Sequence, residues 1–220
     1  MSSPTDALST ILDPRVKEYI DTLHGAEDPL LDRMESYAAE RGFPLIGRAS
    51  GRWLTLLAES IGARRVFEVG SGFGYSAFFF AQAVGVSGEV IGADRDAWEI
   101  ESHREIYSGH PFSSRIYIHQ GEALEVLDTL PGEFDIFLLD CDKKAYSQTL
   151  EHVLPRLRPG GLVLADNVLW GGRTTQEPAE DDVSTRGLRD FNRLIHAHPE
   201  LQSEILPVGD GLAVCRKRSA

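Results

Sequence analysis

From residue 64 onward, short apolar runs rich in β-branched residues alternate with longer segments of helical composition. This alternation is typical of βα units, whose strands pair in parallel and whose helices cover both faces of the sheet. The runs FDIFLLD and GLVLADN are nearly continuously apolar, so we place these two strands in the middle of the sheet. The five predicted strands are RRVFEVG (64–70), EVIGADR (89–95), RIYIHQG (115–121), FDIFLLD (134–140) and GLVLADN (161–167).

The two ends of the chain extend this pattern. Before residue 63, Pro14 opens one predicted helix, EDPLLDRMESYAAERG (27–42) forms a second, and apolar residues at helical spacing from Leu54 to Ile61 indicate a third. After a predicted helix over 184–198, EILPVG and GLAVCRK form two strand-like runs around a Gly-Asp-Gly turn. We therefore predict one α/β domain, 1–220, with a helical extension (1–62) and a Rossmann-like core (63–220). The core should be a doubly wound, mostly parallel sheet of seven strands that ends in an antiparallel hairpin.

Charge and composition argue against several classes of protein. Lysine and arginine total 22 against 34 aspartate and glutamate residues, and the net charge of −12 opposes a broad grip on a phosphate backbone, so nucleic acid is not expected as a partner. The opening MSSPTDALSTILDP lacks the regions of a signal peptide, and the strongest apolar stretch (77–86) is too short to span a bilayer. We expect a cytoplasmic protein without a membrane partner. Two cysteines are too few for a disulfide framework or a zinc cluster.

A glycine-rich turn follows the first predicted strand. FEVGSGFGYS (67–76) places three glycines between a strand and a helix, where the backbone can approach a ligand closely. Asp94 ends the next strand, where a carboxylate can bind both hydroxyls of a ribose. The turn is one residue short of the dinucleotide pattern, and Glu68 would repel a pyrophosphate while suiting the positive charges of S-adenosylmethionine. The plainer interpretations are simple strand-to-helix packing and a pairing of Glu68 with Arg64 or Arg65.

A second group of polar residues follows the fourth and fifth predicted strands. Asp140 ends one strand and Asp166 with Asn167 ends the other, so three oxygen-bearing side chains should meet at the carboxyl edge of the sheet. Hard oxygen ligands suit Mg²⁺, Mn²⁺ or Ca²⁺. Lys143 can reach the same place, where a neighbouring cation and partial burial would favour its proton-accepting form. The plainer interpretation makes the carboxylates helix caps and the lysine solvated surface.

Together these residues resemble the metal-dependent catechol and caffeoyl-CoA type O-methyltransferases, in their bacterial branch, along nearly the whole chain. The resemblance implies an enzyme that uses S-adenosylmethionine and Mg²⁺, Mn²⁺ or Ca²⁺ to methylate a hydroxyl of a catechol-like small molecule, usually as a homodimer. The segments that carry it are FEVGSGFGYS, Asp94, GEALEVL (121–127), FDIFLLDCDKKAY (134–146), DNVLWGG (166–172) and LPVGDGLAVCRKR (206–218).

The resemblance also implies a role for each matching residue. Lys143 would be the base that removes a proton from one of two chelated oxygens, which then attacks the sulfonium methyl in line. The implied metal ligands are Asp140, Asp166 and Asn167. The implied cofactor-binding residues are Ile46, Glu68, Gly70, Ser71, Ser76, Asp94, Glu122, Ala123 and Asp140.

Three other functions remain open at this point. HAHPELQSEILPVGDGLAV (196–214) and FPLIGRASG (43–51) also resemble a bacterial tRNA wobble 5-hydroxyuridine methyltransferase, which would make tRNA the partner despite the negative charge. A chain that kept only the fold and the glycine turn could be a non-catalytic sensor of an adenosyl nucleoside. An NAD-dependent oxidoreductase is a weaker alternative.

Overall fold

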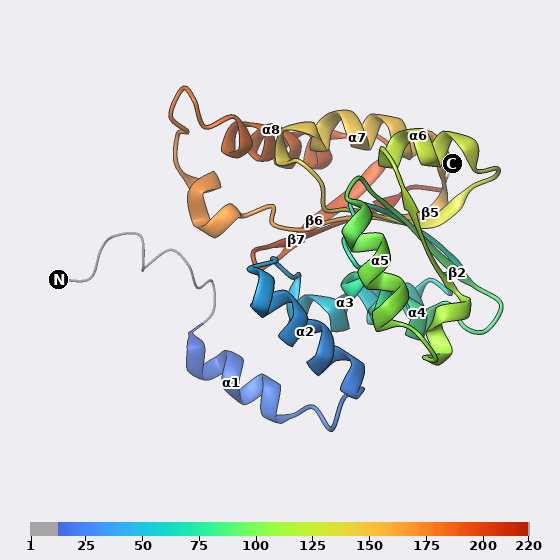
Figure 1. The fold of residues 1–220 in the computed structure, drawn as a ribbon. Helices are drawn as coiled ribbons and strands as arrows, with labels where there is room; N and C mark the ends of the chain where they lie inside the picture. Colours follow the sequence, from blue (N-terminus) through green and yellow to red (C-terminus); the bar gives the residue numbers. More distant parts are fainter. Residues whose placement is uncertain (1–12, 220) are drawn as a thin grey trace. The chain divides into compact units, whose positions relative to one another are not determined.

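A computed structural model of the chain describes residues 13–219, so residues 1–12 of the predicted helical extension lie outside the described part. Seven strands follow the order β3-β2-β1-β4-β5-β7-β6 (Figure 1). The predicted fold class is confirmed, and β4 and β5 take the middle positions predicted from their apolar runs. The strands are β1 (Arg65–Val69), β2 (Glu89–Asp94), β3 (Ile116–Gln120), β4 (Phe134–Leu139), β5 (Leu157–Ala165), β6 (Leu201–Leu206) and β7 (Leu212–Lys217).

The helices also follow the predicted order. Short 3-10 turns separate some of them: η1 (Pro111–Ser114), η2 (Lys143–Ala145), η3 (Leu154–Arg156) and η4 (Trp170–Thr175). The α-helices are α1 (Pro14–Thr22), α2 (Pro29–Arg41), α3 (Gly47–Ser60), α4 (Tyr75–Ala83), α5 (Ala97–Ile106), α6 (Ala123–Thr129), α7 (Tyr146–Val153) and α8 (Val183–Ala197).

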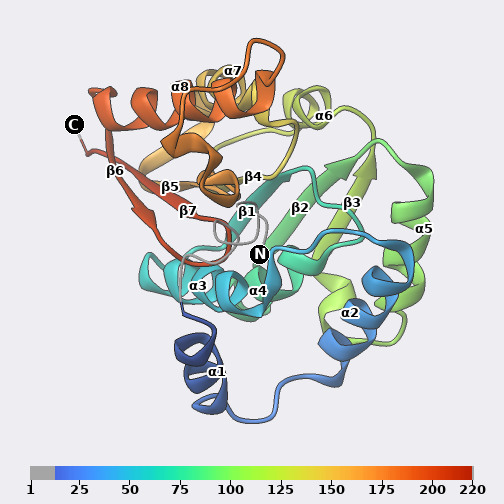
Figure 2. The ribbon, with the colours of Figure 1, turned by 90° about the vertical axis from the view of Figure 1, so that its left-hand side faces the viewer.

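The chain divides into two compact units, one of residues 21–132 and the other of residues 133–219 with 13–20. In the first unit, β1 pairs with β2 and β2 with β3, all in parallel. Figure 2 shows α6 on one side of these strands and α4 on the other. Because both faces are covered, the strands β1 and β2 consist mostly of apolar residues and are almost entirely buried. The prediction of a single domain over 1–220 stays a prediction.

The helix α2 begins and ends where its sequence predicts. The Asp28 side chain accepts the backbone N–H of Leu30 at 2.9 Å, Pro29 occupies the first helical position, and Gly42 closes the helix with a left-handed φ of 63°. These are the standard caps of a helix, and they satisfy backbone groups that the helix itself leaves unpaired.

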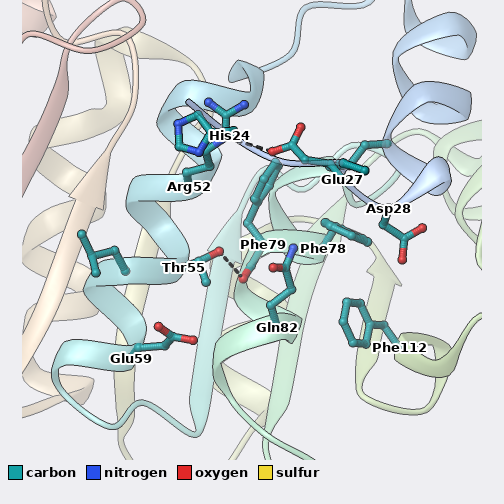
Figure 3. Close-up of a pocket in the computed structure, with 13 residues that line it drawn as sticks. His24, Glu27, Asp28, Arg52, Thr55, Glu59, Phe78, Phe79, Gln82 and Phe112 are labelled. Atoms are coloured by element: carbon teal, nitrogen blue, oxygen red, sulfur yellow. Dashed lines mark hydrogen bonds and ion pairs between the residues drawn. The ribbon is translucent and has the colours of Figure 1, made fainter. Parts of the chain in front are cut away.

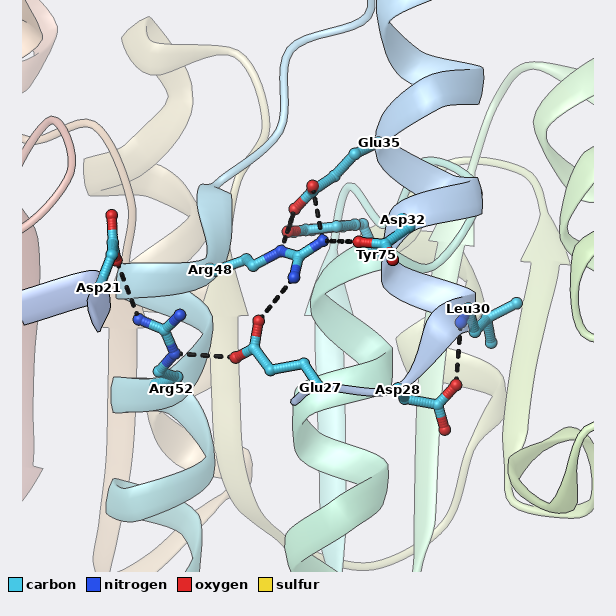
Figure 4. Close-up of polar contacts among 9 residues, drawn as sticks. All are labelled: Asp21, Glu27, Asp28, Leu30, Asp32, Glu35, Arg48, Arg52 and Tyr75. Atoms are coloured by element: carbon cyan, nitrogen blue, oxygen red, sulfur yellow. Dashed lines mark hydrogen bonds and ion pairs between the residues drawn. The ribbon is translucent and has the colours of Figure 1, made fainter. Parts of the chain in front are cut away.

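An arginine on α3 holds three carboxylates at once (Figure 4). The Arg48 guanidinium donates to both oxygens of Glu35 at 2.7 and 2.8 Å, to Glu27 at 2.7 Å and to Asp32 at 2.5 Å. The hydroxyl of Tyr75, the first residue of α4, donates to Glu35 at 2.7 Å. The Arg48 side chain is only 26% exposed, so this network is better shielded from solvent than a surface ion pair. It ties α2, α3 and the start of α4 together.

The second unit joins parallel and antiparallel pairing. β4 pairs with β5 in parallel, and β7 pairs antiparallel with both β5 and β6. The helices α7 and α8 lie on the same side of these strands (Figure 2). Within the described residues, no helix is both long and apolar enough to cross a membrane. The cytoplasmic location stays a prediction.

The starts of two strands differ from the predicted ones: β6 begins at Leu201 rather than at Glu204, and β5 also begins earlier. β5 begins at Leu157, four residues before the predicted start at Gly161, because Leu157 is buried and pairs with Phe134 of β4. A register shift between Phe134 and Ile136 accommodates the irregular Pro159 segment. Proline and two glycines indicate a turn in the sequence, and only the partner strand reveals that the pairing starts earlier.

We predict that replacing Arg48 by leucine destabilises the protein by about 2 kcal/mol, because the partly buried carboxylates of Glu27 and Glu35 lose their shared cation. Urea unfolding of the variant would measure this loss. Arg193→Leu is the control, since Arg193 is 67% exposed and its pair with Asp190 on α8 should contribute less than about 0.5 kcal/mol. Equal stability of the two variants would contradict the role of the network.

Candidate cofactor and metal sites

The glycine turn after β1 is held by Asp94. The backbone N–H of Gly72 donates to Asp94 Oδ2 at 3.0 Å, and that of Asp96 donates to Oδ1 at 3.2 Å. Gly70, Gly72 and Gly74 all have positive φ, at 88°, 52° and 93°. A Cβ on Gly72 would come within 2.8 Å of the Phe43 ring, so a side chain there would be both strained and crowded. The turn therefore brings its backbone against the Asp94 carboxylate, at the place where a ribose site is predicted.

Glu68 and Ser71 form a buried pair beneath this turn. Glu68 is 0% exposed, and the Ser71 hydroxyl donates to its Oε2 at 2.8 Å. Ser71 fills the space above Gly92 of β2, where a Cβ would overlap its Oγ. The two side chains are thus fixed by packing as well as by their hydrogen bond. The interpretation of Glu68 as a carboxylate close to the glycine turn agrees with this geometry.

The remaining predicted cofactor residues of this unit lie at the starts of three helices. Ile46 immediately precedes α3, Ser76 is the second residue of α4, and Glu122 and Ala123 begin α6. The N–H of Gly121 donates to the Asp94 carbonyl at 2.8 Å, which brings the start of α6 beside the end of β2. The Glu122 side chain is about half exposed and pairs with Arg95. The position of Glu122 beside an adenine stays a prediction.

Sequence reasoning missed Glu99, on the first turn of α5. Its carboxyl lies within 4.8 Å of those of Asp94 and Asp96. The residue is 5% exposed, and its Oε2 atom has no hydrogen-bond partner among the described residues. Burial, together with the charges of Asp94 and Asp96, raises the pKa of Glu99 to about 8. The acidic run DRDAWE contains the signal, but sequence spacing alone does not show that the third carboxyl points inward.

In the second unit, parallel pairing of β4 and β5 brings the predicted metal ligands together. Leu139 pairs with Ala165, and the N–H of Asp166 donates to the Leu139 carbonyl at 3.1 Å. Asp140 and Asp166 are therefore the first residues after two adjacent strands. Asp166 is 2% exposed, and its Oδ1 atom has no hydrogen-bond partner among the described residues. Burial and the charge of Asp140 raise the pKa of Asp166.

Lys143 lies in the same place, as predicted. Its Nζ donates to Asp140 Oδ1 at 2.8 Å and to the hydroxyl of Tyr146 at 2.8 Å, and its side chain is 11% exposed. The neighbouring Lys144 is 63% exposed and pairs with Asp142. The interpretation of Lys143 as a solvated surface lysine is therefore wrong, whereas it holds for Lys144.

The loop after β5 has an unusual backbone. Asn167 and Trp170 have φ of 59° and 51°, and they are the non-glycine residues with positive φ in the described chain. Asp210, in the turn between β6 and β7, holds this loop by accepting the N–H of Gly171 through its side chain and that of Leu169 through its carbonyl. The hairpin therefore fixes the loop that begins with the predicted ligand Asn167. Spacing in the sequence does not reveal this contact.

A pocket of about 550 Å³ lies in the unit of residues 21–132 (Figure 3). Phe78, Phe79 and Phe112 form an aromatic wall, and Glu27 at its rim is bound to Arg52 at 2.9 Å. Among the described residues that line it, none is a predicted cofactor or metal ligand. Glu27 and Arg52 are thus paired with each other, and Asp28 pairs with His110, which is not one of the lining residues.

Comparison with known proteins gives the family. The family model described as O-methyltransferase matches residues 24–218. The chain belongs to this O-methyltransferase family. It is 31% identical to a catechol O-methyltransferase of Niastella koreensis, over 90% of this chain and 95% of that protein. It is also 31% identical to caffeoyl-CoA O-methyltransferase 5 of Nicotiana tabacum, over 76% of this chain and 74% of that protein.

Solved structures agree with this assignment. A methyltransferase from Geobacter sulfurreducens superposes with a TM-score of 0.82 at 28% identity, covering 94% of this chain and 98% of that one. An O-methyltransferase from Bacillus cereus in complex with SAH gives a TM-score of 0.83 at 25% identity, covering 93% and 97%. The prediction of an S-adenosylmethionine-dependent O-methyltransferase is confirmed at this level. The individual site residues, the metal and the homodimer stay predictions.

The raised pKa of Glu99 predicts a pH-dependent stability. Between its ordinary value near 4.5 and about 8, the unfolded chain has lost this proton while the folded protein still holds it. Wild-type stability should therefore fall, relative to Glu99→Gln, as the pH rises through this window, by on the order of 2 kcal/mol. Urea unfolding at a series of pH values would measure the difference, with Glu101→Gln, an exposed position on the same helix, as control. A difference that does not change with pH would refute the assignment.

Proposed function

We propose that this O-methyltransferase moves a methyl group from S-adenosylmethionine to one hydroxyl of a catechol-like small molecule, with a hard divalent cation held by Asp140, Asp166 and Asn167. The observation that carries the proposal is the Asp166 carboxyl, which is 2% exposed and has one oxygen without a hydrogen-bond partner among the described residues. The name of the Niastella koreensis relative, a catechol O-methyltransferase, supports the same acceptor class.

The residues present fit a hard cation. A buried carboxylate without enough partners is costly, and here Asp140 and Asp210 raise the pKa of Asp166 further. A bound cation would offset this repulsion. Two carboxylates and an amide carbonyl are the ligand types that Mg²⁺, Mn²⁺ and Ca²⁺ take, and the described residues bring no histidine or cysteine pair to this place that would favour zinc.

The chain's own residues then have distinct tasks. When bound, the cation would supply Lewis-acid chemistry, lowering the pKa of a hydroxyl on a chelating diol. Lys143 would take the proton at its Nζ, which Asp140 and Tyr146 hold at 2.8 Å each. Trp170, whose ring centroid lies 6.0 Å from Lys143 Nζ, offers an aromatic surface to a planar acceptor.

The glycine turn fits the methyl donor in the same way. Asp94 would hold the ribose, and the buried Glu68 with Ser71 would face the positively charged methionine part. Asp140, which is also one of the predicted cofactor-binding residues, would lie near the methionine amine. S-Adenosylmethionine would supply the activated methyl group, and these residues would orient it.

We predict that turnover of a simple catechol requires Mg²⁺ or Mn²⁺ and is abolished by EDTA. Asp166→Asn should lower kcat about 100-fold or more, because the amide removes one of the two charges that hold the cation. The measurement is transfer of labelled methyl groups, with Asp190→Asn on the exposed surface of α8 as control.

Other results of these assays would favour one of the alternative functions. Labelling of hypomodified tRNA without turnover of any catechol would indicate the wobble-uridine reaction. Binding of the cofactor with neither activity would indicate a sensor. Full activity in EDTA would refute the proposed requirement for a divalent cation. The oligomeric state, predicted to be a homodimer, is read from the same preparation by sedimentation.

A further inference from the structure

Tyr146 is a buried residue that is not among the predicted site residues. It begins α7 directly after the η2 turn and is 0% exposed. Its ring packs edge-on against Phe191 of α8, with the centroids 5.3 Å apart. A tyrosine at this position needs partners for its hydroxyl, and those partners belong to the residues around the predicted metal site.

The hydroxyl contacts three groups that come from three segments. It accepts a hydrogen bond from Lys143 Nζ at 2.8 Å, and its own hydrogen is shared between the carbonyl oxygens of Leu139 and Asp166, each at 3.0 Å. Leu139 is the last residue of β4, next to Asp140, and Asp166 follows β5. One hydroxyl therefore links both ligand-bearing strand ends to the candidate base.

The direction of these hydrogen bonds is fixed by the surroundings. The two carbonyls can only accept, so the phenol must donate to them and its lone pairs face Lys143. With Asp140 on its other side, the Lys143 nitrogen is held at two points.

We propose that Tyr146 is a positioning residue for the methyl-transfer reaction: its hydroxyl sets the place of Lys143 Nζ beside Asp140 and fixes the spacing of the ends of β4 and β5. This inference rests on the proposed function for the role of Lys143, whereas the link between the two strand ends is independent of it. Tyr146 acts through Lys143 and the strand ends, without itself touching the acceptor.

The test compares Tyr146→Phe, Lys143→Met and the double variant. Tyr146→Phe should lower kcat for a catechol about 10- to 100-fold and leave KM for S-adenosylmethionine within about twofold. In the Lys143→Met background the same substitution should cause little further loss, because its effect passes through that lysine. Tyr117→Phe is the matched control, since Tyr117 also donates to a backbone carbonyl, that of Ser114, but is 47% exposed on β3.

A second measurement needs neither substrate nor metal. Amide hydrogen exchange of Tyr146→Phe should be about tenfold faster in the segments 139–143 and 166–170, with the rest of the described chain unchanged. Unchanged exchange there would overturn the link between the strand ends. A fall in kcat that is equally large in the Lys143→Met background would overturn the positioning role. Absence of catechol turnover in the wild type would refute the proposed function, and the exchange result would still decide the structural link.

Discussion

The parallel pairing of β4 with β5 is the constraint on which the candidate acceptor site depends. Because Leu139 lies opposite Ala165, an aspartate follows each of the two strands, and the charge of the partly exposed Asp140 acts on the buried carboxyl of Asp166. Apolar residues on both faces make the pairing stable. The repulsion between Asp140 and Asp166 is thus imposed by the core of the sheet, which is strong enough to hold charges that would separate in a flexible loop.

Much of the fold follows from local sequence patterns. Asp28 and Pro29 mark the start of the helix α2 and Gly42 marks its end, and each strand of the parallel part overlaps a predicted strand-like run. Asp94, Asp140, Asp166 and Lys143 could be found because strand ends in open α/β sheets gather at one edge. Such residues are predictable since their positions depend on a strand's end rather than on the packing around it.

Features that depend on distant parts of the chain were not predictable. The early start of β5 at Leu157 requires its partner Phe134, and the Arg48 network requires carboxylates from two segments before α3. In the sequence, Glu99 is only one member of an acidic run, and Tyr146 is only the last residue of the FDIFLLDCDKKAY segment. Their importance comes from burial and, for Tyr146, from hydrogen bonds that tertiary packing creates. Periodicity identifies elements, but it does not show which polar atoms become enclosed.

The left-handed backbone at Asn167 narrows what evolution or protein engineering can place there. With φ of 59°, the position accepts glycine, asparagine or aspartate far more readily than other residues. Glycine offers no side-chain oxygen, and aspartate would add a third negative charge beside Asp140 and Asp166. Asparagine alone combines the required backbone shape with a neutral oxygen donor. Libraries that aim to broaden the range of acceptors therefore gain more from varying the later residues of the loop between β5 and α8 than from this residue.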